Sequence, residues 1–383
     1  MCDPAALAVS LFFKTASKPD QRAIVNGRER VLTAVDHREP DRVPITFDAQ
    51  PEVFELLYGH FGISTREELW DALNVDTWLE GPVVKDPREK QLANGLFQNR
   101  WGYHQKKQPY NANGKTGYYD EIVYYPLSDI ESACDLDHYD WPDPNLLEFG
   151  HLNELRKSQP HRAIIAHITH GGYFNATFLR GMEQFLVDLA MDPVLTQALV
   201  ERTSTYLIEA LDRLLEQAPD GFDIFYVADD YCMSSGPLFS PDVFKRLIKP
   251  YLRAIADRVH AHGKKFLLHV CGSVRLLLPE IIDSGVDILE PIQRRSTGMN
   301  LRELKKEFGR DLTFYGSVDL LQTLNKGSVK DVQNEVRRNI EILGPGGGFI
   351  LGPGHTYIQI DAPLENILAM YETACEQSIP VYG

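Results

Sequence analysis

Short apolar runs alternate with longer amphipathic runs along most of the chain, most regularly from residue 151 onward. The short runs are rich in β-branched and aromatic residues, which is typical of strands, and they lie at 43–47, 163–168, 222–228, 265–270, 286–289, 312–315 and 349–351. The longer runs have helical spacing, and examples lie at 241–262, 276–284, 300–308 and 329–343. The last of these carries an i, i+3/i+4 stripe from Val329 to Leu343, which predicts one buried helix face.

Strand–helix alternation with short connections predicts βαβ units and a parallel sheet. At least seven strands favour an α/β fold of the (β/α)8 TIM-type barrel class over an open doubly wound sheet, which is the structural alternative. We expect a single barrel domain over 1–383, with an N-terminal helical extension over 1–40. Residues 80–150 are rich in Tyr, Gly, Asn, Asp and Pro, and turn signals around Asn113 and Gly114 predict a β-hairpin excursion there.

Composition and charge narrow the class of protein. The 383 residues include 39 Lys and Arg against 54 Asp and Glu, which gives a formal charge of −15, and the hydrophobic fraction is 43%. This fraction is ordinary for a globular chain, and the acidic balance argues against nucleic acid or anionic lipid as a partner. The apolar stretch at 5–13 is shorter than the roughly 20 residues of a spanning helix and follows Asp3 rather than a basic region, which disfavours a signal peptide. Five scattered cysteines, an odd number, predict a reduced, cytoplasmic protein.

Reactive side chains gather where the predicted strands end. In a (β/α) barrel the active site lies at the carboxyl ends of the strands, so these residues are the first candidates. They include several types that bind metal ions or transfer protons: Asp48, His167, Thr169, His170, Asp229, Asp230, His269, Cys271, Glu290, Ser317, Asp319 and His355.

The sequence His269-Val270-Cys271-Gly272 is the sharpest of these signals. In an extended segment, residues two apart project to the same side, so His269 and Cys271 could bind one ion. Zn²⁺ favours nitrogen and sulfur ligands with an added carboxylate or histidine, and we expect Glu290 and His355 to complete the set. The plainer alternative is a chance pairing with a buried cysteine, because Cys is among the most buried residue types.

Asp229 and Asp230 form a second constellation, directly after an apolar run. Either could orient substrate or transfer a proton, as could Glu290, and helix capping or a salt bridge is an equal alternative for the pair. For Arg42 we predict a role in a salt bridge. Candidate substrate-binding residues are Asp48, His167, His170, Arg180, Tyr226, Tyr231 and Asp319.

Several motifs together resemble the uroporphyrinogen decarboxylase superfamily. They are residues 39–44 (Glu-Pro-Asp-Arg-Val-Pro), 228–230 (Ala-Asp-Asp), 269–273 (His-Val-Cys-Gly-Ser), 285–291 (Gly-Val-Asp-Ile-Leu-Glu-Pro), 314–319 (Phe-Tyr-Gly-Ser-Val-Asp) and 352–355 (Gly-Pro-Gly-His). The resemblance implies a (β/α)8 barrel whose site faces the mouth.

Two chemistries are known in this superfamily. The decarboxylases use no metal and bind a polycarboxylate tetrapyrrole through an arginine-rich N-terminal segment, which this chain lacks after Pro44. The other branch comprises zinc-dependent, corrinoid-linked methyltransferases, whose zinc is held by His-x-Cys, an acid and a C-terminal Cys. His269, Cys271 and Glu290 match that pattern, and His355 stands where the Cys is expected.

The resemblance therefore implies Zn²⁺ and methyl transfer between a small, possibly methoxylated substrate and a corrinoid carried on a separate protein. It also implies a homodimer. Metal-independent decarboxylation and a non-catalytic ligand binder are the alternative functions.

Overall fold

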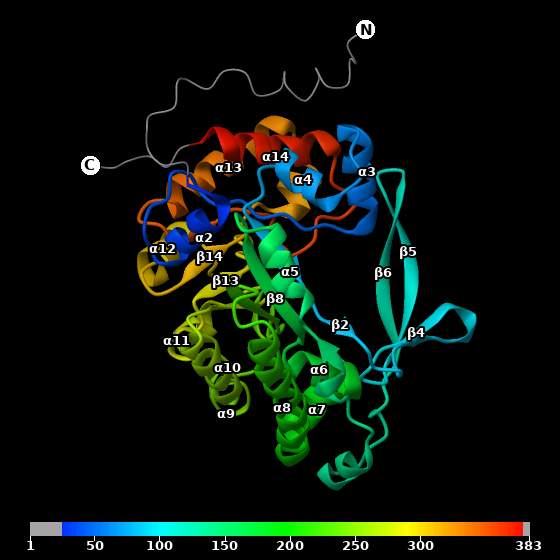
Figure 1. Ribbon diagram of the computed structural model, residues 1–383. Helices are drawn as coiled ribbons and strands as arrows, with labels where there is room; N and C mark the ends of the chain where they lie inside the picture. Colours follow the sequence, from blue (N-terminus) through cyan, green and yellow to red (C-terminus); the bar gives the residue numbers. More distant parts are fainter. Residues whose placement is uncertain (1–24, 378–383) are drawn as a thin grey trace.

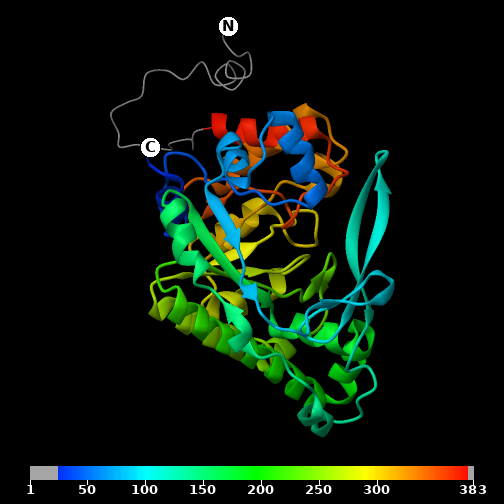
Figure 2. The ribbon, with the colours of Figure 1, turned by 45° about the vertical axis from the view of Figure 1, so that its right-hand side comes forward.

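The computed structural model describes residues 25–377, and a curled parallel sheet of seven strands forms its centre (Figures 1 and 2). In spatial order the strands are β1 (Thr77–Glu80), β8 (Ala163–His170), β9 (Ile224–Ala228), β12 (Lys265–His269), β13 (Ile288–Glu290), β14 (Thr313–Tyr315) and β15 (Phe349–Ile350). Apolar side chains on both faces of these strands are buried, as expected of a parallel sheet covered by helices.

Thirteen α-helices lie among the described residues, most of them around the outside of the sheet (Figure 1). They are α2 (Gly27–Val35), α3 (Pro51–Phe61), α4 (Arg66–Ala72), α5 (His151–Ser158), α6 (Gly172–Arg180), α7 (Met182–Met191), α8 (Pro193–Gln217), α9 (Pro241–Leu247), α10 (Lys249–Ala261), α11 (Leu278–Asp283), α12 (Leu301–Phe308), α13 (Val329–Leu343) and α14 (Leu364–Glu376). Short helical turns are η1 (Ala93–Gly95), η2 (Ala133–His138), η3 (Pro144–Leu146), η4 (Arg275–Leu277) and η5 (Leu320–Leu324). None of the helices within 25–377 is long and apolar enough to cross a membrane.

The predicted elements are recovered with local differences. Helix α13 buries Val332, Val336 and Ile340 as its stripe predicts, and Ser328 and Asp331 form a capping box at its start. The helix expected over 241–262 is instead α9 followed by α10, because Pro250 lacks the amide hydrogen of a continuous helix. Strand β1 was not predicted, since only Trp78 and Leu79 of its four residues are apolar.

The run at 43–47 forms an isolated bridge rather than a named strand, yet it contacts both edges of the sheet. Thr46 N donates to Leu351 O at 2.9 Å on the β15 side, and Asp76 N donates to Ile45 O at 2.8 Å on the β1 side. The α/β class and the curled parallel sheet are confirmed. The complete eight-stranded barrel remains a prediction.

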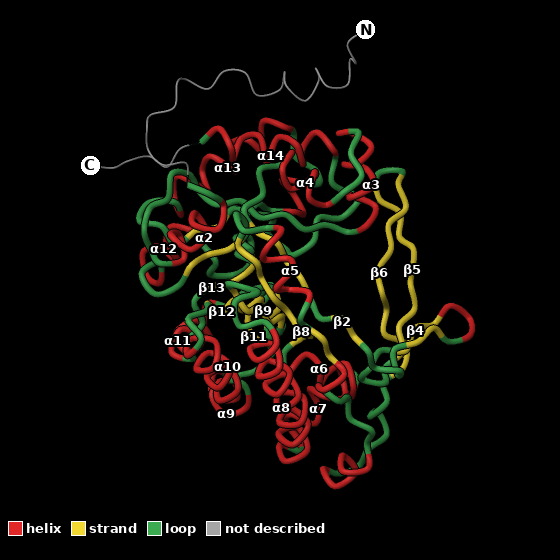
Figure 3. The backbone as a smooth tube through the Cα atoms, viewed as in Figure 1, coloured by secondary structure: helices red, strands yellow, loops and turns green. Residues whose placement is uncertain are grey.

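Residues 80–150 leave the body of the molecule between β2 (Val83–Val84) and β7 (Leu147–Glu148). They contain an antiparallel sheet of β3 (Lys90–Gln91), β4 (Leu96–Gln98), β5 (His104–Ala112) and β6 (Lys115–Tyr124). Asn113 and Gly114 join β5 to β6 with φ of 51° and 75°, the left-handed conformation that a two-residue hairpin requires. The β5–β6 arm runs alongside the body (Figure 3). Of the predicted N-terminal extension over 1–40, only residues 25–40, which contain α2, lie inside the described residues.

A buried carboxylate ties the N-terminal part of the chain to the sheet. Asp76 accepts hydrogen bonds from Arg30 Nη1 at 2.6 Å, Arg42 Nη1 at 2.7 Å and Ile45 N at 2.8 Å. The salt-bridge interpretation of Arg42 is therefore confirmed. Since Arg30 belongs to α2, whereas Ile45 belongs to the bridging segment and Arg42 directly precedes it, Asp76 holds these two pieces of chain beside β1.

Asp76→Asn is expected to lower the free energy of unfolding by about 3 kcal/mol, because Arg42 loses its only carboxylate partner and the buried Arg30 keeps only Asp41. Urea unfolding measures the change. Glu154→Gln is the matched control: Glu154 pairs with Lys157 where both side chains are more than two-thirds exposed, at 73% and 70%, and its loss should cost less than about 0.5 kcal/mol. Equal effects of the two substitutions would contradict the role given to Asp76.

Candidate functional site

The register of three neighbouring strands arranges the candidate residues in two rows. His269, the last residue of β12, lies opposite Ala228 of β9 and opposite Glu290 of β13. Two residues farther along, Cys271 and Asp230 come level with each other, and Cys271 N donates to Asp230 Oδ1 at 2.7 Å. The first row therefore holds His269 and Glu290, and the second row, nearer the mouth, holds Cys271 and Asp230.

One possible ligand atom from each of Asp230, His269 and Cys271 lies within 4.8 Å of the other two. His269 Nε2 is 3.4 Å from Cys271 Sγ and 3.6 Å from Asp230 Oδ1. Nitrogen, sulfur and oxygen atoms so placed are a donor set that suits Zn²⁺. We refer to these three residues as the triad.

Glu290 lies on the other side of the histidine ring. Its Oε2 is 2.5 Å from His269 Nδ1, and its Oε1 accepts from Thr356 Oγ1 at 3.1 Å. The carboxylate is thus used to hold the ring, and in this arrangement Asp230, rather than Glu290, accompanies Cys271 at Nε2. This differs from the predicted ligand set because strand register places Glu290 one row deeper than Cys271. Burial by itself would lower the pKa of His269, but the adjacent Glu290 carboxylate raises it well above the ordinary value.

His355 stands beside the triad without joining it. Its ring centroid is 5.9 Å from that of His269, with the two rings nearly perpendicular. Burial lowers the pKa of His355, and the charge of His269 acts in the same direction. His355 lies in the loop after β15, which is the strand end where the sequence analysis expected it.

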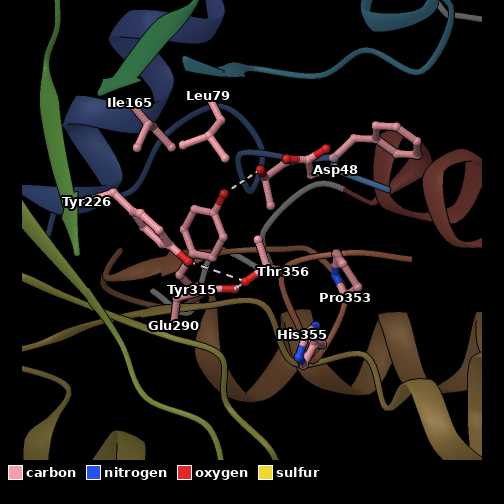
Figure 4. A pocket seen from close by; sticks show the side chains of 11 residues that line it. Asp48, Leu79, Ile165, Tyr226, Glu290, Tyr315, Pro353, His355 and Thr356 are labelled. Carbon is pink, nitrogen blue, oxygen red and sulfur yellow. Dashed lines mark hydrogen bonds between the residues drawn. The ribbon is translucent and has the colours of Figure 1, made fainter. Parts of the chain in front are cut away.

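A small cavity of about 20 Å³, with Glu290 of the deeper row in its wall, lies inside the curled sheet (Figure 4). Glu290, His355, Asp48 and Tyr226 contribute to its wall, as the sequence predicted for a site at the strand ends. Its remaining lining residues were not predicted: Thr46, Phe47, Leu79, Ile165, Tyr315, Pro353 and Thr356. Burial raises the pKa of Asp48 to about 6, although the hydrogen bond from Ala49 N opposes the shift.

Sequence reasoning missed two polar residues that touch the site. Gln293 Nε2 lies 3.4 Å from Cys271 Sγ, and its Oε1 accepts from Gly272 N at 2.9 Å. Thr356 Oγ1 lies 3.1 Å from His269 Nδ1 and 3.4 Å from Tyr226 Oη. Both follow predicted ligands closely, Gln293 three residues after Glu290 and Thr356 one after His355, which is the only signal that could have drawn attention to them.

Asp229 has a structural role. Its carboxylate accepts from Phe174 N at 2.6 Å, in the first turn of α6, and from Tyr231 Oη at 2.7 Å. The capping alternative is therefore the one that the structure supports, and Tyr231, fully buried, serves Asp229 rather than a substrate. A side chain at Gly171 would come within 2.2 Å of this carboxylate, so only glycine fits there. Burial raises the pKa of Asp229 to about 7.

Two predicted substrate-binding residues are occupied elsewhere. Arg180 Nε donates to Asp188 at 2.7 Å and its Nη1 donates to the carbonyls of Leu127, Ser128 and Ile130, so it anchors the excursion to α6 and α7. Asp319 caps η5 and pairs with Arg295. Both predictions are corrected for the same reason: each residue's charged atoms are already bound by neighbours that the sequence did not place beside it.

His167 and His170 remain at the wall of the mouth. His167 packs against Gly81 and Tyr226, and His170 packs edge-on against Phe174 and Phe178. Burial lowers the pKa of each histidine to about 4, so both rings are neutral at physiological pH.

Asp48→Asn is expected to flatten the dependence of stability on pH. An acid whose folded pKa exceeds its unfolded value stabilises the fold below about pH 4, and this contribution is lost as the pH rises through about 6. The loss of unfolding free energy between these values should be smaller in the variant by on the order of 2 kcal/mol. Urea unfolding at several pH values measures it. Asp242→Asn, at a side chain that is 92% exposed, should leave the profile unchanged; an unaltered profile in Asp48→Asn would refute the assignment.

Comparisons with known proteins agree with the motif resemblance. The chain is 26% identical over 254 residues to methylated-thiol–coenzyme M methyltransferase of Methanosarcina mazei, an alignment covering 63% of each protein. It is 28% identical over 150 residues to methylcobamide:CoM methyltransferase MtaA of Methanosarcina barkeri, covering 39% of this chain and 40% of that one. These alignments span less than two thirds of either relative.

A solved structure, titled methyltransferase from Methanosarcina mazei, superimposes with a TM-score of 0.63 at 19% identity, covering 92% of this chain and 98% of that one. This likeness concerns the fold alone. The family model described as uroporphyrinogen decarboxylase (URO-D) matches residues 130–377, which include the triad, Glu290 and His355. The chain therefore belongs to the uroporphyrinogen decarboxylase family.

Proposed function

We propose that this protein is a zinc-dependent methyltransferase that moves a methyl group between a small substrate and a corrinoid carried on a separate protein. The observation that carries the proposal is the triad of Asp230, His269 and Cys271 together with a buried cavity that Glu290 lines. The names of both relatives as methyltransferases acting with coenzyme M support the same reaction class.

The residues present fit a zinc ion. Three different donor atoms converge, and the Glu290 carboxylate bound to His269 Nδ1 fixes the ring with Nε2 toward Cys271 and Asp230, which is the usual arrangement behind a metal-bound histidine. His269, Cys271 and Asp230 would hold the ion, with His355 as a fourth candidate ligand. When bound there, Zn²⁺ would act as a Lewis acid toward a substrate oxygen or sulfur.

The chain's own residues have separable tasks in this proposal. Glu290 and Thr356 orient His269 from below, and Gln293 positions Cys271 by its contacts with Sγ and with Gly272 N. Asp230 either stays with the triad or turns to orient the substrate, since it lies with Cys271 in the row nearer the mouth. Tyr226, Asp48 and His355 shape the floor on which the small end of a substrate rests.

The decarboxylase alternative has less support. A polycarboxylate substrate needs cations to replace its hydration, but Arg42 and Arg180 are held by Asp76 and Asp188. Arg66, near Asp48, lies over the rings of Trp70 and Trp78.

We also propose that residues 43–47 occupy the position of the eighth strand and that the chain forms one barrel domain.

Protein purified without chelator is expected to contain about one Zn²⁺ per chain, as a three-residue donor set with one open position implies. Cys271→Ala should lose most of this zinc, because it removes the only sulfur of the triad. Elemental analysis by mass spectrometry measures the content. Cys134→Ala, at an exposed free cysteine, is the matched control and should retain the metal. Absence of zinc from the unmodified protein would defeat the proposal.

The variants Asp230→Asn and Glu290→Gln test which of the two acids binds zinc and which only orients His269. If Asp230 binds the ion and Glu290 only holds the ring, both variants lose zinc affinity, Glu290→Gln by about 10- to 100-fold. Competition with a chromogenic chelator measures the affinities. Unchanged affinity in Asp230→Asn together with complete loss in Glu290→Gln would instead restore Glu290 as the ligand.

Zinc-loaded protein should change the absorbance of methylcobalamin in the presence of a methyl-accepting thiol, and dialysis against chelator should abolish this activity. Zinc returned to the dialysed protein should restore it. Release of CO₂ from a tetrapyrrole, unaffected by chelator, would point to the decarboxylase instead.

A further inference from the structure

A second and much larger opening lies beside the triad, between the β5–β6 arm and α6. This arm cleft has a volume of about 470 Å³, within the range of small-molecule sites. Its walls come from the arm and the residues next to it, from the end of β8, from α6 and from the first residue of α7. The lining residues are Tyr103, Gln105, Asp120, Glu121, Ile122, Tyr125, His170, Thr177, Phe178 and Met182.

The arm is held in place at both ends, so the cleft is a formed feature. At its base, Tyr103 packs on Phe178 with ring centroids 5.6 Å apart. At its tip, Asn113 Nδ2 donates to Asp361 O at 2.8 Å, in the loop between β15 and α14. The arm therefore spans from α6 at its base to the loop before α14 at its tip, alongside the body of the molecule (Figures 1 and 2).

Register gives the distance from this cleft to the triad. His170 lies opposite Ala228, and Ala228 lies opposite His269, so the three residues form one row across three adjacent strands. Two strand spacings amount to roughly 10 Å. A substrate that reaches both places is longer than methanol or methanethiol and has the dimensions of a substituted ring.

The lining residues suit an uncharged aromatic ring and offer no cation to an anionic group. Phe178, Tyr103 and the edge of His170 offer the faces and edges that rings pack against. No Lys or Arg lines the cleft. The charged residues of the lining, Asp120 and Glu121, are both acids and would repel an anion.

We propose that the arm cleft binds the uncharged aromatic ring of the methyl-bearing substrate, with the methyl group directed toward the triad. The ring subsite stands on the geometry of the cleft, whereas the direction of the methyl group rests on the proposed function. A carboxylate on the ring would lose its hydration here without gaining a cationic partner, which is costly. The subsite therefore selects uncharged methoxyarenes over methoxybenzoates.

Gln105 is the position from which to test the cleft, because it lines the opening from the arm and is not part of the core. Isothermal titration of the chain with methoxybenzene, without zinc or cobalamin, should detect binding. Gln105→Trp should fill the cleft and weaken this binding about tenfold or more. Lys106→Trp, one residue along and outside the lining, should change it less than about twofold. Circular dichroism and thermal melts verify that both variants fold.

Charge selection has its own test at the same residue. The unmodified chain should bind methoxybenzene about tenfold more tightly than para-methoxybenzoate. Gln105→Arg should reverse this preference by giving the carboxylate a partner, while Lys106→Arg should not. Equal binding of both probes to the unmodified chain, or no effect of either Gln105 variant, would overturn the inference.

These outcomes are separable from the fate of the proposed function. Ring binding without any methyl transfer by the zinc-loaded protein would leave the subsite standing and refute the methyltransferase. Methyl transfer from methanethiol or methanol with no ring binding would do the reverse.

Discussion

The hydrogen bond between Glu290 and His269 Nδ1 is the interaction on which the site depends. It is possible only because β12 and β13 run parallel with these two residues directly opposite each other. A carboxylate as buried as Glu290, which is 1% exposed, would be costly without partners. His269 and Thr356 supply them, and in return the ring is fixed with Nε2 toward Cys271 and Asp230. A single pairing in the sheet thus sets both the depth of the acid and the orientation of the histidine.

The polar groups around this pair divide into those that bind ligands and those that hold the frame. Asp229 and Asp230 are neighbours in sequence, but their side chains go to different tasks. Asp229 turns back to the amide of Phe174 and the hydroxyl of Tyr231, whereas Asp230 reaches the amide of Cys271. The fixed frame explains how three donor atoms of different chemistry can stay within 4.8 Å of one another.

The excursion over residues 80–150 adds a second, larger opening beside the site. The curled sheet alone provides a cavity of about 20 Å³, too small for more than the end of a substrate, whereas the arm and α6 line a cleft of about 470 Å³. Arg180 has a structural role here, although its positive charge had suggested that it binds an anionic substrate. By donating to three carbonyls of the segment after β6, it anchors the excursion against the helix that forms the opposite wall.

The sequence by itself determined the α/β class, most strands and helices, and the cluster of His269, Cys271 and Glu290, because periodicity and strand-end position are local properties of the chain. It could not determine which acid accompanies Cys271, since Asp230 and Glu290 both follow an apolar run and only register separates their depths. It also could not place Thr356, Gln293 or the partners of Arg180 and Asp319, which come from contacts between residues far apart in sequence. Tertiary structure decided these, because a polar atom is free for substrate only when folding leaves it without a closer partner.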